Sequence, residues 1–140
     1  MIRSVSMMVA LGLVGFTAGA PLPAPIPPKE PEVPLELRKA QLKAALAVYT
    51  RQSEDYNAGR GGTGSDRIEW ARRVLDARLA LAGGRDERIA ACRSYVDEMK
   101  AFEKVCKSKV DAGTASAGDL KVAEYWRIEA EILLFKAEAK

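Results

Sequence analysis

The sequence predicts an all-α fold in which antiparallel helical hairpins form an up-down-up-down four-helix bundle with coiled-coil-like packing. All 7 prolines lie between residues 21 and 34, so residues 35–140 contain none. Those residues are rich in Ala, Leu, Arg, Lys and Glu, which are strong helix formers. Their apolar positions recur every three, four and seven residues, without the alternation that is typical of strands.

The first two helices are predicted over residues 35–58 and 66–82. In the first, one side of the helix is formed by Leu35, Ala40, Leu42, Ala45, Leu46, Tyr49 and Tyr56. In the second, the matching side is formed by Ile68, Ala71, Leu75, Leu79 and Ala82. Each pattern is that of an amphipathic helix with one face toward a core.

The third and fourth helices are predicted over residues 86–112 and 117–139. The third carries an apolar seam, interrupted by Glu103, of Ile89, Cys92, Val96, Met99, Cys106 and Val110. The fourth carries Leu120, Ala123, Trp126, Ala130, Leu133, Leu134 and Ala137. We expect Trp70, Trp126 and Tyr125 to be core or groove-edge aromatics.

The breaks between these helices contain recognisable turn and cap residues. Gly59 and Gly113 each follow an alanine at a helix end, where glycine accepts the left-handed conformation. Asp66 follows Thr63, and Asp119 follows Ser116, at the spacing of a capping box. Gly83-Gly84 is a turn or a kink in one long helix, and the polar Arg85-Asp86-Glu87 that follows favours the turn.

The chain repeats one hairpin twice, over residues 35–82 and 85–140. Tyr56-Asn57-Ala58-Gly59 corresponds to Val110-Asp111-Ala112-Gly113 at an offset of 54. After the turn, residues 73–78 correspond to residues 126–131 at an offset of 53. Two such units, joined at Gly83-Gly84, make the predicted antiparallel helical domain of residues 35–140.

The residues before this domain predict export. Arg3, the apolar run from Val5 to Phe16 and the small residues Ala18-Gly19-Ala20 are typical of a signal peptide over residues 1–20. The run is short for a transmembrane helix, so an uncleaved anchor is the weaker alternative, and cleavage would leave no stable transmembrane span. Residues 21–34 are predicted to be a proline-rich linker in a disordered N-terminal segment. The protein is therefore expected to be periplasmic or secreted.

The composition argues against several kinds of chemistry. The chain has no histidine, which is the commonest general base and metal ligand. We therefore expect that the protein is not an enzyme and that it has no cofactor and no metal site. The net charge of +3 is too small to favour nucleic-acid binding. Residues 59–64 match G-x-G-x-x-G, but a dinucleotide site needs a strand before that loop, so we expect a hairpin turn.

The two cysteines, Cys92 and Cys106, have three possible states. In one continuous helix they would lie about 21 Å apart, whereas a disulfide needs Cα atoms within about 7 Å. Two buried thiols are therefore favoured. There are two alternatives: a disulfide between two molecules, or a break in the helix that lets Cys92 and Cys106 form a disulfide with each other.

One segment resembles a known family. Residues 110–120, followed by Ala123-Glu124 and Glu129-Ala130-Glu131, resemble the helical repeat of TolC-like outer-membrane efflux factors. The segment is also similar to small exported bacterial proteins of unknown function with the same hairpin. The resemblance covers mainly residues 100–140 and implies a helical scaffold in the cell envelope. It implies no channel, because the membrane strands and the length of a full efflux factor are missing.

Two functions follow as expectations. The first is a non-enzymatic exported scaffold or interaction protein of the cell envelope, which binds an envelope partner or copies of itself through its helix faces. The alternative is a periplasmic helical bundle that binds a small ligand or senses stress.

Overall fold

The computed structural model describes residues 32–61 and 63–139. The predicted signal peptide at 1–20 and nearly all of the predicted linker at 21–34 lie outside the described residues. The described residues form four helices and no strand: α1 (Leu35–Asn57), α2 (Gly64–Leu81), α3 (Arg85–Asp111) and α4 (Ala117–Glu138). The predicted all-α class is confirmed, and each helix boundary lies within about two residues of its prediction.

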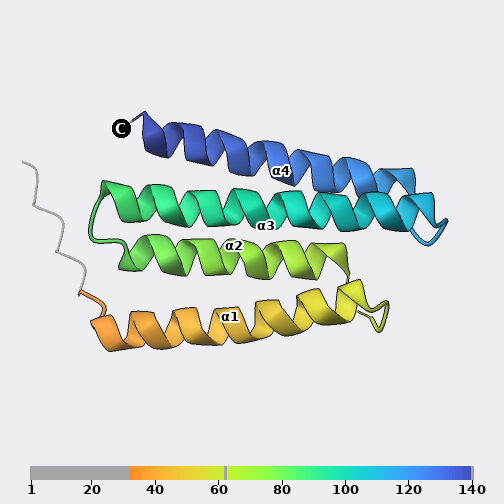
Figure 1. Ribbon diagram of the computed structural model, residues 1–140. Coiled ribbons are helices and arrows are strands. Elements are labelled where there is room, and N and C mark those ends of the chain that lie inside the picture. The colour runs from red at the N-terminus through yellow and green to blue at the C-terminus, as the bar shows by residue number, and fades with distance from the viewer. Residues whose placement is uncertain (1–31, 62, 140) are drawn as a thin grey trace, which may run out of the picture. The chain divides into compact units, whose positions relative to one another are not determined.

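The four helices pack in the order of the chain. α1 packs on α2, α2 on α3, and α3 on α4, so that successive antiparallel helices lie side by side (Figure 1). In a closed ring of four helices α4 would also pack extensively against α1, and here it does not. The two hairpins therefore form an open row, with α1 and α4 at its edges.

The core lies between the two central helices. Among the described residues, α1 buries only Ala45 and α4 only Ala123 and Ala130. The other buried apolar residues lie on α2 and α3: Ile68, Ala71, Val74, Leu75, Ala77, Ala91, Cys92, Tyr95, Val96, Met99, Phe102 and Cys106. The outer helices thus pack on a core that α2 and α3 largely supply.

The seam predicted for the third helix is largely buried. Cys92, Val96, Met99 and Cys106 are buried, whereas Ile89 is partly exposed. α3 is one continuous helix, so the alternative in which a break brings the two cysteines together is wrong. Both cysteines are free thiols and both are buried.

Both hairpin turns end their first helix in the same way. Gly59 and Gly113 have φ of 67° and 72°, in the left-handed region that favours glycine. The residue after each glycine donates its N–H to a carbonyl five residues earlier: Arg60 to Asp55 at 3.0 Å, and Thr114 to Lys109 at 2.8 Å. This is the Schellman arrangement.

Both hairpin turns also begin their second helix in the same way. The Thr63 side chain accepts from the Asp66 N–H, and the Asp66 side chain accepts from the Thr63 N–H. Ser116 and Asp119 repeat this reciprocal pair at α4. Hydrogen bonds from Ser116 hold the pKa of Asp119 below its usual range. Gly83-Gly84 lies between α2 and α3 and is a turn rather than a kink.

Candidate functional site

The outward face of α4 is apolar. Tyr125, Ile128, Ile132 and Phe135 are exposed by 62%, 47%, 47% and 71%. Their spacing of three, four and three residues places them on one side of the helix, in the pattern of a coiled-coil seam. We call these four residues the outer seam.

The other face of α4 already packs on the core. Ala123, Ala130 and Ala137 recur every seven residues, and the first two are completely buried against the inner helices. Partly buried Trp126, Leu133 and Leu134 flank them. α4 is therefore apolar on two sides, which is typical of a helix that is buried on both. Large exposed apolar patches mark sites of protein or membrane interaction.

Glutamates line one edge of the outer seam. Glu124, Glu131 and Glu138 recur every seven residues, and each has a cation of the same chain beside it. The closest pairs are Glu124–Lys121 at 2.7 Å, Glu131–Arg127 at 2.9 Å and Glu138–Arg93 at 2.9 Å. Ion pairs at a protein surface contribute only about 0–1 kcal/mol each, so these pairs hold the glutamates in place only weakly.

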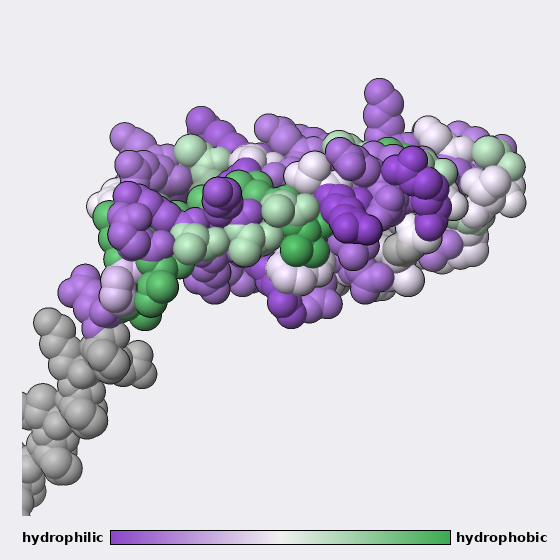
Figure 2. All heavy atoms as spheres, turned by 90° about the horizontal axis from the view of Figure 1, so that it is seen from below, coloured by the Kyte–Doolittle hydropathy of each residue, from purple (hydrophilic) through white to green (hydrophobic). Residues whose placement is uncertain are grey.

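The opposite edge of the row is the outer face of α1. Figure 2 views the molecule from this side and shows hydrophobic surface at the end where α1 begins. Val33, Leu35 and Leu37 are exposed there by 50%, 56% and 61%. Ala40 and Ala44 are exposed further along the helix. This face is therefore weakly apolar and lined mainly by small side chains.

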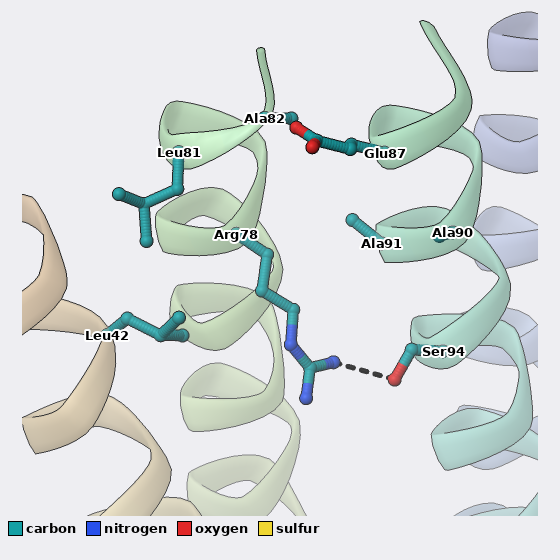
Figure 3. Close-up of a pocket in the computed structure, with 8 residues that line it drawn as sticks. All are labelled: Leu42, Arg78, Leu81, Ala82, Glu87, Ala90, Ala91 and Ser94. Atoms are coloured by element: carbon teal, nitrogen blue, oxygen red, sulfur yellow. Dashed lines mark hydrogen bonds between the residues drawn. The ribbon is translucent and has the colours of Figure 1, made fainter. Parts of the chain in front are cut away.

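A groove of about 370 Å³ lies where α1, α2 and α3 meet. Its walls are mostly apolar, with Leu42 from α1, Leu81 from α2 and Ala91 from α3 (Figure 3). Arg78 crosses from α2 to α3, where it donates to Ser94 Oγ at 2.6 Å and to Glu98 Oε1 at 3.2 Å. Arg78, one of the two charged residues that line the groove, thus joins two helices of the chain, and the other, Glu87, accepts from the Gly83 N–H at 2.6 Å.

Glu98 is the acidic partner in that junction. Burial raises the pKa of Glu98, and the Arg78 guanidinium opposes the shift. Its second oxygen, Oε2, is buried without a hydrogen-bond partner in the structure. The junction is therefore an incompletely satisfied ion pair, and it joins the two hairpins.

A second polar cluster lies at the end that carries both hairpin turns. Arg67 is 5% exposed, stacks on Phe102 at 5.1 Å, and donates to Asn57 Oδ1 at 3.0 Å. Lys109 lies 3.6 Å from the centre of the Tyr56 ring and donates to the Tyr56 carbonyl at 2.5 Å. Burial and a hydrogen bond with Cys106 raise the pKa of Tyr56. These cations contact aromatic rings and amide groups of α1 and α3, so the cluster joins α1, α2 and α3 to one another.

The predicted turn and cap residues lie beside this cluster. Gly59, Asp66, Gly113, Ser116 and Asp119 occupy the two turns at that end (Figure 1). Of the G-x-G-x-x-G segment, Gly59, Arg60, Gly61 and Thr63 lie between α1 and α2, and Gly64 is the first residue of α2. The structure gives these residues contacts that end and begin helices, and it brings none of them to the outer seam.

Sequence reasoning missed the outer seam and the burial of Arg67. Tyr125 was expected at a core or groove edge and is instead 62% exposed. The spacing of Tyr125, Ile128, Ile132 and Phe135 is visible in the sequence, but the inner apolar set of the same helix hides it. For Arg67 the sequence carries no comparable signal, because a charged residue near a helix start is ordinarily solvated.

Among residues 32–61 and 63–139, no group of three or more Cys, Asp or Glu side chains is placed to hold a metal ion. None of the four helices is long and apolar enough to cross a membrane. No family model, curated protein or solved structure matches this chain.

Proposed function

We propose that the protein is a non-enzymatic, exported helical scaffold of the cell envelope that binds another protein chain through the outer seam of α4. One observation carries the proposal. Four large apolar residues repeat with coiled-coil spacing on the exposed face of a helix whose opposite face is already packed.

The size of the seam indicates how strong such binding would be. Fully burying a large apolar side chain contributes about 1.5–3 kcal/mol. The four side chains are already about half buried, so covering them adds on the order of 4–6 kcal/mol. Association costs at least about 4 kcal/mol in lost freedom. Stable binding therefore needs contacts beyond the seam, and a partner that covers the seam alone would bind transiently.

The proposed location rests on the N-terminal sequence. Arg3, the apolar run to Phe16 and Ala18-Gly19-Ala20 support a signal peptide. The efflux-factor resemblance supports a helical hairpin, because Gly113, Ser116 and Asp119, which carry it, terminate and cap helices. Proximity to an efflux assembly stays a prediction.

Photo-crosslinking tests the proposal. A photoreactive amino acid is placed in the full chain at Ile132 or Phe135, in the seam, and at Asp97 or Lys104, which are exposed on α3. We expect a discrete protein adduct from the seam positions and none from the α3 positions.

Two outcomes would contradict the proposal. Equal labelling at all four positions would mean that the seam is ordinary surface. Absence of seam adducts, together with a melting temperature that rises with a specific small molecule, would favour the ligand-binding alternative.

A further inference from the structure

We infer that the chain that covers the outer seam is a second copy of this protein, whose α1 packs on α4 of the first. The inference rests on the proposed function and names its partner. It follows from the internal repeat, from the open ends of the row and from the side chains on its two outer faces.

The repeat makes α4 the counterpart of α2. At the offset of 53, Leu75 and Leu79 of α2 correspond to Ile128 and Ile132 of α4. Leu75 is buried in one cluster with Ala91, Cys92 and Tyr95 of α3, and Leu79 packs against it. Two of the four seam residues, Ile128 and Ile132, thus occupy the positions through which α2 packs against α3.

The repeat also makes α1 the counterpart of α3. Ala91 and Ser94 of α3 lie toward α2 (Figure 3), where Ala91 is in the cluster with Leu75 and Ser94 accepts from Arg78. Glu98 also lies toward α2, because it accepts from Arg78. At the offset of 54, their counterparts on α1 are Leu37, Ala40 and Ala44, all exposed. The positions that form the contact between hairpins inside the chain therefore recur at the two ends of the row, where no other helix covers them. The side chains differ, because Arg78, Ser94 and Glu98 correspond there to Glu131, Ala40 and Ala44.

The two free surfaces fit each other in size. α4 presents Tyr, Ile, Ile and Phe, whereas α1 presents small alanines beside Leu37. Large side chains of one helix enter the gaps over small residues of another, which lets the helices approach closely. Two α4 seams would bring large side chains against large side chains.

Charge favours the same pairing. The two helices differ in the sign of their net charge, because α4 has five acidic and three basic residues and α1 has four basic and three acidic ones. Lys43 lies next to Ala44 and has no ion pair among the described residues. An antiparallel α4–α4 contact would instead bring together two helices that both have an excess of acidic residues, which is unfavourable.

The resulting contact is heterologous, since it joins different surfaces of the two copies. A heterologous contact repeats from copy to copy and produces either a ring or an open filament. The α1–α2–α3–α4 row would continue through each new copy, with every α4–α1 contact resembling the α2–α3 contact inside the chain.

Crosslinking between single-cysteine positions tests the pairing. Arg78 contacts Ser94 within the chain, and the corresponding positions are Glu131 and Ala40. Full-length E131C and A40C are given different tags, mixed, and treated with a short bismaleimide. The native Cys92 and Cys106 are 5% and 0% exposed and so are protected from the reagent. Far-ultraviolet circular dichroism verifies that both variants remain helical.

We expect an adduct that carries both tags in the mixture and no adduct from either variant alone. E131C mixed with D97C, whose position is exposed on α3, is the matched control and gives none. An adduct from E131C alone would replace the inferred contact with an α4–α4 dimer. No adduct in any mixture, with photo-crosslinking at Ile132 to a different protein, would overturn the inference and leave the proposed function standing.

Discussion

At the scale of single residues, Arg67 shows how this chain buries a charge without a carboxylate. Its guanidinium lies 5.1 Å from the centre of the Phe102 ring and 6.0 Å from that of Tyr56, and it donates to Asn57. A planar, weakly hydrated cation can stack on rings and still direct its N–H groups in plane. Arg67 thereby holds α1, α2 and α3 together at the end with both turns.

Replacing Arg67 with lysine is expected to lower the free energy of unfolding by about 1–2 kcal/mol, because an ammonium loses the stacking and is more costly to bury. Urea denaturation measures the change. Arg73→Lys is the matched control: Arg73 lies over Trp70 at 4.5 Å, but its side chain is 54% exposed. The control should change stability by no more than about 0.5 kcal/mol. Equal changes in the free energy of unfolding for the two variants would mean that the burial of Arg67 does not add to the stability gained from its stacking.

Glu98 gives a prediction about pH. Burial raises its pKa above the ordinary value of 4.5, so the folded protein binds the proton more tightly than the unfolded chain does. Relative to Glu98→Gln, the wild type should therefore gain free energy of unfolding as the pH falls from 7 through the raised pKa. The gain in free energy of unfolding should level off once the pH is below the ordinary glutamate pKa of 4.5. Urea titrations of both proteins between pH 7 and 4 measure this gain. Parallel pH profiles of the free energy of unfolding would contradict a raised pKa of Glu98.

At the scale of the helical elements, the first helix of each hairpin ends at a glycine in the left-handed region, Gly59 or Gly113. Gly113 has φ of 72° and no atom near the place of a Cβ, so strain in the backbone is the only obstacle to a side chain there. Gly113→Ala should cost about 1–2 kcal/mol.

Gly118→Ala is the control within the same hairpin. Gly118 lies in the first turn of α4, and its added Cβ would make an ordinary 3.4 Å contact with Ser116 Oγ. Alanine is the better helix former, so this variant should be neutral or stabilised by up to about 1 kcal/mol. Thermal melts of the two variants should shift in opposite directions, and a shared direction would contradict the strain argument.

The helices were predictable from sequence because their ends are encoded locally. Prolines stop at Pro34, and glycine turns and capping boxes mark the later boundaries. How the helices pack was less accessible, because periodicity shows that a face is apolar but not what covers it. Leu35 illustrates the limit: it belongs to the predicted apolar side of its helix and is 56% exposed, since α1 packs mainly on α2.

At the scale of the whole described domain, burial is unequal between inner and outer helices. α2 and α3 contain most of the buried residues, whereas the outer helices contribute three alanines. Regions with few buried apolar contacts open at lower free energy. Amide hydrogen exchange should therefore be slowest in α2 and α3, and faster along α1 and α4.

The same measurement reports on assembly. If copies join through α4 and α1, exchange in these two helices should slow as protein concentration rises, while α2 and α3 change little. Exchange that is equally slow in all four helices of a dilute monomer would contradict the unequal stability inferred from burial.

Packing in chain order also has a kinetic consequence. Every extensive helix contact joins elements that are neighbours along the sequence, so only short loops need to close, and the relative contact order is low. Chains of this kind fold in microseconds to milliseconds. As the chain is synthesised, each new helix can pack at once on the helix that precedes it. The helices can therefore pack in the order in which they are synthesised.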